Sequence, residues 1–349
     1  MPHAASRMPY LIVKTLPLST MKNLLFLLAQ YPSDLSKRDR LEELISEVQN
    51  WKETTTLINA HGIIALAWYN IREARLETLI PEEIRQILEN GYRQSVVRNL
   101  WLKERWKEVS DILGNAGIKH ILLKGMALEH TIYEGKGLRQ MTDNDILIRK
   151  DEAVRAWDLL RKNGFSILTP KSKLHMRIMK ELSNHLPTLY KDGYALEIHV
   201  SLFPHNDPYH DITSDLPAIG REIEIDGKKA CVLNDKVHRR YLVSHFLRHA
   251  NAGECQFRTY ADILLLPGDA APGFQDEFLL QPDRKNISGY RQAAYRDRVK
   301  FISPEYRLPF LLGDIFPSVE WMKERYKCGS LKAMIYYPHR LGKLWWLVG

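Results

Sequence analysis

Hydrophobic positions in the first third of the chain recur with the spacing of amphipathic helices. In residues 41–48 and again in residues 101–109, apolar side chains stand three and four positions apart, which is the period of one buried helix face. Pro81 followed by two glutamates is a typical helix start. We therefore expect a helical region over residues 21–116, preceded by a loose extension over residues 1–20.

The pattern changes after Gly117, where short apolar runs and period-two alternation replace the helical spacing. Residues 195–201 alternate cleanly between apolar and other side chains, as a half-buried strand does. Asp226-Gly227 is a strong signal for a hairpin turn. We expect strands over residues 118–124, 144–149, 195–201, 223–225 and 230–233, and helices over residues 127–133 and 152–163.

Helical spacing returns after Lys236. The candidate helices span residues 238–250, 256–265, 292–299 and 319–326. The predicted fold class is therefore α+β. A small mixed sheet over residues 117–235 is flanked by the N-terminal helical region and by a C-terminal helical region over residues 236–349.

Composition narrows the class of protein. A length of 349 residues suits roughly two domains of about 150 residues each, and 45% hydrophobic with 26% charged residues excludes a disordered or fibrous chain. The three cysteines are far apart and form no CxxC pair, which argues against a zinc ribbon or a disulfide framework. A reducing, cytoplasmic setting fits best. We expect no membrane span, because no apolar run approaches the ~20 residues that one needs.

The net charge of +8 is concentrated at the C-terminal end. Residues 284–349 hold thirteen Lys and Arg against five Asp and Glu, a difference of +8, so residues 1–283 balance. Such a segment could attract nucleic acid or nucleotide phosphates, or it could be a solvated helix surface. Aromatic residues stand among the bases, at Trp321, Tyr326, Tyr336 and Tyr337. They could stack on nucleic-acid bases or pack a C-terminal bundle.

Two acids at the start of a predicted strand carry the sharpest chemical signal. On a strand, Asp143 and Asp145 point to the same face, and adjacent carboxylates repel unless a cation lies between them. Such hard oxygen ligands suit Mg²⁺. A DxD pair alone is common in surface turns, but Glu197 adds a third acid on a later strand, with His199 on the same face. A buried acid there needs a partner, either a metal or the basic Lys124 and Arg139.

Several residues around these acids have more than one interpretation. Lys124-Gly125, where a strand gives way to a helix, could admit a phosphate to free backbone N–H groups or be a tight turn. Arg139 could bind a phosphate or hold an aspartate in place. His199 could orient Glu197, touch substrate or be structural. Arg258 and Asp262 stand four apart on a predicted helix and are expected to pair.

A histidine pair completes the set of candidate residues. His245 and His249 stand four apart on a predicted helix, a spacing that could hold zinc. The HExxH signature is absent, because Phe246 stands where that motif has glutamate. Helix packing with polar partners is the other interpretation.

Residues 121–148 resemble the signature of an uncharacterised nucleotidyltransferase family within the polymerase-beta-like nucleotidyltransferase superfamily. The likeness extends to residues 60–67, 196–202, 245–249 and 258–266. It implies transfer of a nucleoside monophosphate from an NTP, such as ATP, to a hydroxyl acceptor with release of pyrophosphate. Two Mg²⁺ ions are implied, for which Mn²⁺ could substitute.

The resemblance also assigns roles. Asp143 and Asp145 match the family's paired metal ligands, and Glu197 matches its third carboxylate, with a possible role as general base. Lys124 and Gly125 occupy the loop where the wider superfamily carries Gly-Ser or Gly-Gly, so the triphosphate must be held differently. His245 and His249 are implied to contact nucleotide or acceptor. The alternatives are a catalytically silent nucleotide- or polyanion-binding module and a toxin-like modifier of tRNA or protein.

Overall fold

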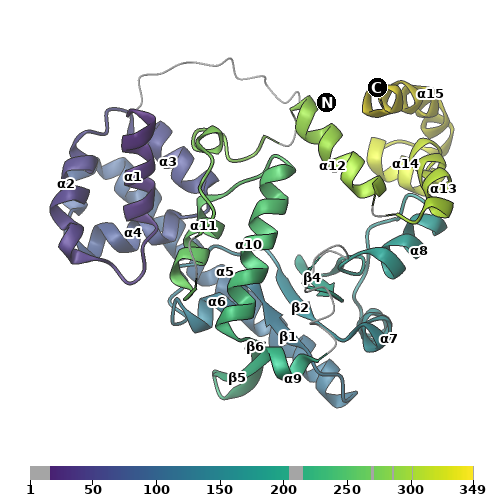
Figure 1. Ribbon diagram of the computed structural model, residues 1–349, viewed down its shortest axis with the longest axis horizontal. Coiled ribbons are helices and arrows are strands. Elements are labelled where there is room, and N and C mark those ends of the chain that lie inside the picture. Colours follow the sequence, from purple (N-terminus) through teal and green to yellow (C-terminus); the bar gives the residue numbers. More distant parts are fainter. Residues whose placement is uncertain (1–15, 204–214, 269–270, 285–286, 301, 349) are drawn as a thin grey trace.

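The chain folds into groups of helices around a small sheet, as the computed structural model shows (Figure 1). The structure describes residues 16–203, 215–268, 271–284, 287–300 and 302–348. The fold class is α+β, as the sequence predicts. The expected loose extension over residues 1–20 lies mostly outside the described residues, but its end was placed too late because the first helix begins at Leu18.

The N-terminal region is helical throughout its described length. Its helices are α1 (Leu18–Leu28), α2 (Arg38–Ser46), α3 (Trp51–Ala60), α4 (Ile64–Glu73) and α5 (Glu82–Asn115), with short 3₁₀ turns η1 (Leu35–Lys37) and η2 (Glu77–Leu79). Helix α5 begins directly after Pro81 and places Glu82 and Glu83 in its first turn, where acids stabilise the positive end of the helix dipole.

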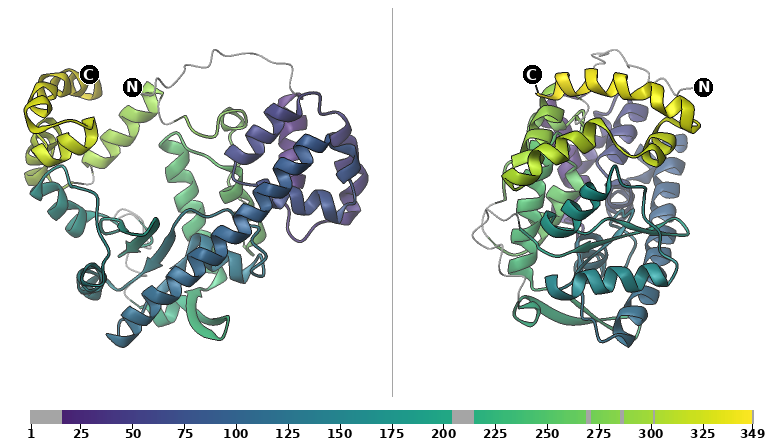
Figure 2. Two further views of the ribbon diagram at one scale, coloured as in Figure 1. Left: turned by 180° about the vertical axis from the view of Figure 1, so that it is seen from behind. Right: turned by 90° about the vertical axis from the view of Figure 1, so that its right-hand side faces the viewer.

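Helix α5 connects two hydrophobic cores. Its first half contributes Ile84 and Leu88 to the core of the N-terminal helices. Its second half contributes Leu102 and Trp106 to the core beneath the sheet. Figure 2 (left) shows α5 running diagonally from the N-terminal helices past the sheet. A single long helix therefore fixes the position of the sheet against the N-terminal region.

The sheet has six strands in the order β3-β4-β2-β1-β6-β5. They are β1 (Ile121–Leu123), β2 (Asn144–Leu147), β3 (Leu189–Lys191), β4 (Tyr194–His199), β5 (Gly220–Ile225) and β6 (Lys228–Leu233). Strands β2 and β4 are parallel, as are β1 and β6, while β1 pairs with β2 in antiparallel fashion. Five strands were predicted; β3 was not, because three residues beside a turn give too short a pattern to detect.

Alternation along the strands separates two faces of the sheet. Ile146, Leu196 and Ile198 lie in the core shared with α5 and with α7 (Lys150–Lys162). Leu123 and Leu147 face the opposite core, together with Tyr241, which belongs to α10 (Asp235–Asn251). The two faces of this part of the sheet therefore pack against different cores.

The remaining helices frame the sheet. Helix α6 (Lys124–Thr131) follows β1 directly, so the first predicted strand ends before Lys124. Helices α10 and α11 (Phe257–Leu265) pack toward the N-terminal core. A third group lies on the far side of the sheet (Figure 1), and it comprises α8 (Lys173–Leu182), α12 (Ser288–Lys300), α13 (Pro304–Ile315), α14 (Val319–Tyr326) and α15 (Ser330–Val348). The short α9 (Leu216–Ile219) precedes β5.

A buried aspartate joins the helices of this third group to one another. Asp314 of α13 accepts hydrogen bonds from Lys171 Nζ and, at 3.0 Å, from Tyr295 Oη. His175 Nε2 lies 3.4 Å from the same carboxylate. Burial acts to raise the pKa of Asp314, but the His175 and Lys171 contacts outweigh it and lower the pKa to about 2. The charged form of Asp314 is therefore favoured by the fold.

Among the described residues, none of the helices has both the length and the apolar composition that crossing a bilayer requires.

Candidate functional site

One cavity brings together every candidate site residue named from the sequence. It has a volume of about 370 Å³ and lies where β1, β2 and β4 meet helices α6, α10 and α11. Among the residues that line it are all nine of these candidates, Lys124, Gly125, Arg139, Asp143, Asp145, Glu197, His199, His245 and His249. A cavity of this size lies within the range of small-molecule sites.

Strand register explains why the acids converge. In the parallel pair of β2 and β4, Asp145 stands opposite Glu197 and Leu147 stands opposite His199. His199 Nε2 lies 2.9 Å from Asp145 Oδ1 and 3.6 Å from Glu197 Oε2. Asn144, between the two aspartates, points into the core and donates to the Leu102 carbonyl and to Tyr194 Oη. The alternation predicted from the sequence is therefore present at this site.

Asp145, Glu197 and His199 form a compact group of ligand atoms. One donor atom from each lies within 4.8 Å of the others, and across the described ranges this is the group of three or more His, Cys, Asp and Glu side chains that could hold a metal ion. His199 thus stands where the sequence led us to expect Asp143. Asp143 lines the same cavity, close enough that Asp145 and Glu197 add to the effect of burial in raising its pKa.

Lys124 binds the most buried of these acids. Its Nζ lies 2.8 Å from Asp145 Oδ1, and the Asp145 side chain is 6% exposed. Lys124 has a φ of +42°, a conformation that is uncommon outside glycine and is often found at functional sites. Burial would raise the pKa of Asp145, but Lys124 and the His199 hydrogen bond outweigh it, so this pKa lies well below its usual range. Asp145 is therefore a carboxylate anion in the fold.

The donor set fits a divalent cation. Glu197 is half-buried; burial acts to raise its pKa, but the His199 hydrogen bond together with the charges of His185 and Lys124 outweighs burial and lowers that pKa. Asp143 Oδ1 accepts a bond of 3.2 Å from Thr142 Oγ1, and Glu197 Oε1 accepts a long one of 3.4 Å from Thr188 Oγ1. The carboxylates of Asp143, Asp145 and Glu197 thus line one cavity with the imidazole of His199. Carboxylate oxygens suit hard divalent ions, and an imidazole also suits transition-metal ions.

Arg139 holds an aspartate rather than lying free in the cavity. Its Nε and Nη2 lie 2.9 Å and 2.8 Å from Asp262 Oδ2. Asp262 Oδ1 accepts a further bond of 2.9 Å from Tyr133 Oη. The predicted pairing of Asp262 with Arg258 is therefore wrong. Tertiary contact brought a distant arginine closer to Asp262 than its neighbour one helical turn away.

Arg258 reaches the cavity instead. It donates to the Gln140 carbonyl and, at 2.8 Å, to Gln256 Oε1. Burial, with the nearby charge of Arg139, lowers the pKa of Arg258 to about 10. Arg258 remains a cation at neutral pH, and it faces the carboxylates across the cavity.

His245 and His249 form a stacked pair on α10. Their ring centroids are 4.2 Å apart with an interplanar angle of 29°. His245 Nδ1 is buried and has no hydrogen-bond partner in the described part of the chain. Burial, and then the charge of Lys124, holds the pKa of His245 well below its ordinary value. His245 is thus a neutral ring with a free polar atom beside the cavity, and the pair is not part of the compact ligand group.

Comparison with known protein families assigns the chain to one of them. Residues 47–287 match the protein family described as Uncharacterised nucleotidyltransferase. The chain belongs to this family. No curated protein and no solved structure matches the chain. All the cavity residues lie within the matched range, so the family assignment and the site concern the same part of the molecule.

The structure also places residues at the cavity that sequence reasoning missed. They are His185, Arg248, Gln256, Arg258 and Thr259, among others. His185 lies in a bridge with His199, their ring centroids 5.6 Å apart. It comes from an irregular segment without a periodic pattern, so no sequence signal marked it. Arg258 had a signal, since its helix belongs to the segments that resemble the family.

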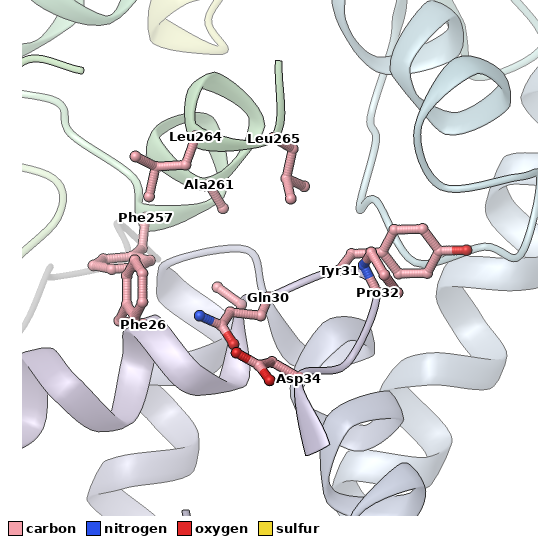
Figure 3. Close-up of a pocket in the computed structure, with 10 residues that line it drawn as sticks. Phe26, Gln30, Tyr31, Pro32, Asp34, Phe257, Ala261, Leu264 and Leu265 are labelled. Atoms are coloured by element: carbon pink, nitrogen blue, oxygen red, sulfur yellow. The ribbon is translucent and has the colours of Figure 1, made fainter. Parts of the chain in front are cut away.

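A second cavity in the protein has a different character. It has a volume of about 260 Å³ and lies between the segment after α1 and helix α11 (Figure 3). Its lining is mostly apolar, including Phe26, Phe257 and Leu264. The acid there, Asp34, already accepts from Ser36 and pairs with Lys37 at 2.9 Å. This cavity lacks the facing carboxylates and cations of the first one.

Proposed function

We propose that this protein transfers a nucleoside monophosphate from an NTP to a hydroxyl of an acceptor, with Mg²⁺ at the site. The observation that carries the proposal is the Asp145–Glu197–His199 group beside Lys124, in a cavity of a chain that belongs to a nucleotidyltransferase family. The acceptor oxygen forms a bond to the α-phosphorus, and the bond from that phosphorus to pyrophosphate breaks. The hydroxyl proton passes to a base of the protein.

The acids have distinct roles in this proposal. Asp145 and Glu197, with Asp143 or His199, hold the divalent ions, which stabilise the attacking and leaving oxygens when bound. The Glu197 side chain is 25% exposed against 6% for Asp145. Glu197 is therefore the more accessible carboxylate to an incoming acceptor, and it is placed to take the hydroxyl proton.

The cations neutralise the leaving group. Lys124 and Arg258 both line the cavity, and both can exchange their present contacts for phosphate oxygens. Charge that develops on pyrophosphate is then stabilised by groups that are already in place. Arg139 keeps its bond to Asp262 and positions the segment before β2. Gly125 leaves room for the approach of Arg139, whose Nη1 would lie 2.8 Å from a Cβ at that position.

One observation favours a catalytically silent binding module as the second candidate. Lys124 already supplies a positive charge to Asp145, at 2.8 Å. In a silent module that ion pair would persist when nucleotide binds. The protein would then bind NTP or another polyanion without turnover.

A label-transfer experiment tests the proposal. The purified protein is incubated with Mg²⁺ and each of the common NTPs, labelled at the α-phosphate, with RNA, protein or small hydroxyl compounds as acceptor. Transfer of label with release of pyrophosphate, abolished in Asp145→Asn, supports catalysis. NTP binding in calorimetry without transfer to any acceptor class favours the silent module.

A further inference from the structure

Helix α15 exposes an apolar face that packs against nothing in the described chain. The exposed fractions are 90% for Leu331, 59% for Met334 and 73% for Ile335. These residues stand three and four positions apart, so they share one side of the helix. Ala333, on another side, is fully buried. An amphipathic helix normally packs its apolar face against a protein core. Because this face is exposed, it is suited to contact an apolar environment outside the protein.

The neighbouring helix α13 adds a second apolar row. Leu308, Leu312 and Phe316 recur every four residues and are 65%, 47% and 55% exposed. The Phe316 ring lies 6.2 Å from that of Tyr337, and Arg340 Nε donates to the Asp314 carbonyl at 3.2 Å. These contacts join α13 to α15. Two exposed rows on adjoining helices are more than scattered surface leucines and mark an interaction site.

Charge indicates which partner this surface fits. Residues 325–349 contain five basic residues and no Asp or Glu. They are Arg325, Lys327, Lys332, Arg340 and Lys343. An apolar face beside basic residues, with no acids in the same segment, is typical of helices that lie in the headgroup region of anionic membranes.

The aromatic residues of this region are engaged within the protein. The Tyr326 and Tyr336 rings stack on each other at 4.2 Å and 5°. Trp321 lies beneath the Arg340 guanidinium at 4.7 Å, and Tyr337 Oη donates to the Pro317 carbonyl at 2.6 Å. They pack the bundle, which was one of the two interpretations from the sequence. Apart from Phe316, the exposed apolar residues of the two rows are aliphatic, and aliphatic side chains are poor platforms for nucleic-acid bases.

We propose that α13 and α15 form a docking surface for an anionic lipid membrane. Helix α15 lies along the interface, with Leu331, Met334 and Ile335 entering the acyl boundary and Lys332 contacting lipid phosphates. Figure 1 places α15 at the outer edge of the C-terminal helices, where a flat surface can reach it. These helices lie outside residues 47–287 of the family match, so the surface is independent of the proposed transfer reaction.

Vesicle sedimentation of the full-length protein tests this surface. One set of vesicles is pure phosphatidylcholine, and in the other about a third of the lipid is phosphatidylglycerol. The protein is expected to sediment with the anionic vesicles and to be released by high salt. The double variant Leu331→Glu/Ile335→Glu should bind them at least about tenfold more weakly. Lys332→Gln should reduce the preference for anionic vesicles.

A matched control separates the surface from a general effect of added charge. Val97→Glu changes a residue of α5 that is 66% exposed, and it should bind vesicles like the unmodified protein. Equal binding of the double variant and the unmodified protein would overturn the proposal, as would equal binding to both vesicle types. Light scattering that shows a dimer lost in the double variant, without vesicle binding, would assign the face to a second copy instead.

Discussion

The Nζ of Lys124 lies 2.8 Å from Oδ1 of Asp145, the oxygen that His199 Nε2 also approaches at 2.9 Å. A lysine therefore sits within the group of side chains best suited to hold a cation. Burial acts to lower the pKa of Lys124, but Asp145 outweighs it and raises that pKa above its usual value. Lys124 and a divalent cation consequently compete for the same carboxylate.

Removal of the lysine charge should strengthen metal binding. In Lys124→Met, we expect Mn²⁺ to bind at least about tenfold more tightly, because a near cation no longer repels it. Transfer activity should fall, because Lys124 is also proposed to bind phosphate. Calorimetric or paramagnetic Mn²⁺ titration measures the affinity. Lys37→Met, which changes an exposed pair with Asp34, is the control; tighter binding there too would contradict a specific role for Lys124.

Asp145 should be the most sensitive acid for turnover. We expect Asp145→Asn to reduce transfer by about 10²–10³-fold, since the site loses a charge that acts on the transition state. Circular dichroism should show an unchanged helix content. Asp111→Asn, at a side chain that is 70% exposed, should retain full activity. Normal turnover by Asp145→Asn would remove this residue from the mechanism.

Substitution of Gly125 by a residue with a side chain should destabilise the protein. A Cβ there would lie 2.7 Å from Met141 Sδ and 2.8 Å from Arg139 Nη1. Met141 is flexible, but Arg139 is held by Asp262, so Gly125→Ala should cost about 1–3 kcal/mol of stability and weaken NTP binding. Gly114→Ala on α5 meets nothing within 4 Å and should be neutral or stabilising by up to about 1 kcal/mol. Urea denaturation compares the two, and equal effects would refute the close approach.

Loss of either partner from the ion pair of Arg139 with Asp262 should lower the stability of the fold strongly. Their side chains are 8% and 0% exposed, and loss of one partner from a buried pair costs about 3–5 kcal/mol. We expect Asp262→Asn and Arg139→Gln each to lower the free energy of unfolding in that range. The double variant should lose less than the sum. The exposed pair of Arg93 with Glu89 should contribute less than about 1 kcal/mol, and a similar value for both pairs would contradict this prediction.

Asp314 should make stability depend on acid pH. Its pKa of about 2 in the fold lies below the usual value of 3.8 for this side chain, so the ionised form stabilises the folded state by about 2 kcal/mol. That contribution is complete above about pH 5 and is lost as pH falls from about 4 to 2. Asp314→Asn should therefore be less stable at neutral pH, with a gap that narrows in acid. Asp39→Asn, 99% exposed, should show no gap; a pH-independent gap at Asp314 would exclude an ionic origin.

Local patterns account for much of the fold. Five of the six strands and most helices were predictable, because hydrophobic period reports which face of an element is buried. Elements too short to show a full hydrophobic period were not predicted. Strand β3 has three residues, and α9 has four, so neither gives a full period. The helices α13 and α15 were missed because each contains a proline and exposes apolar residues. Helix α8 was also missed, although Leu174, Ile178 and Leu182 recur with helical spacing.

The sequence was sufficient to predict which acids lie at the site, but not which residues pair with one another. Asp143, Asp145 and Glu197 were found through strand alternation, and all three line one cavity. The pairing of Asp262 with Arg139 instead of Arg258 was not predictable, because the choice depends on where residue 139 lies in space. His185 was missed because an irregular segment carries it.

The sequence by itself determined the α+β class, the faces of the strands and the chemical types of the site residues, because these depend on periodicity and side-chain chemistry. The tertiary structure decided the parallel register that sets Asp145 opposite Glu197, the contact of Lys124 with Asp145 and the choice of Asp262 as partner of Arg139. It also left the apolar face of α15 exposed. These contacts join residues that are far apart in the chain. Which of them form therefore depends on how the elements pack and on which groups become buried.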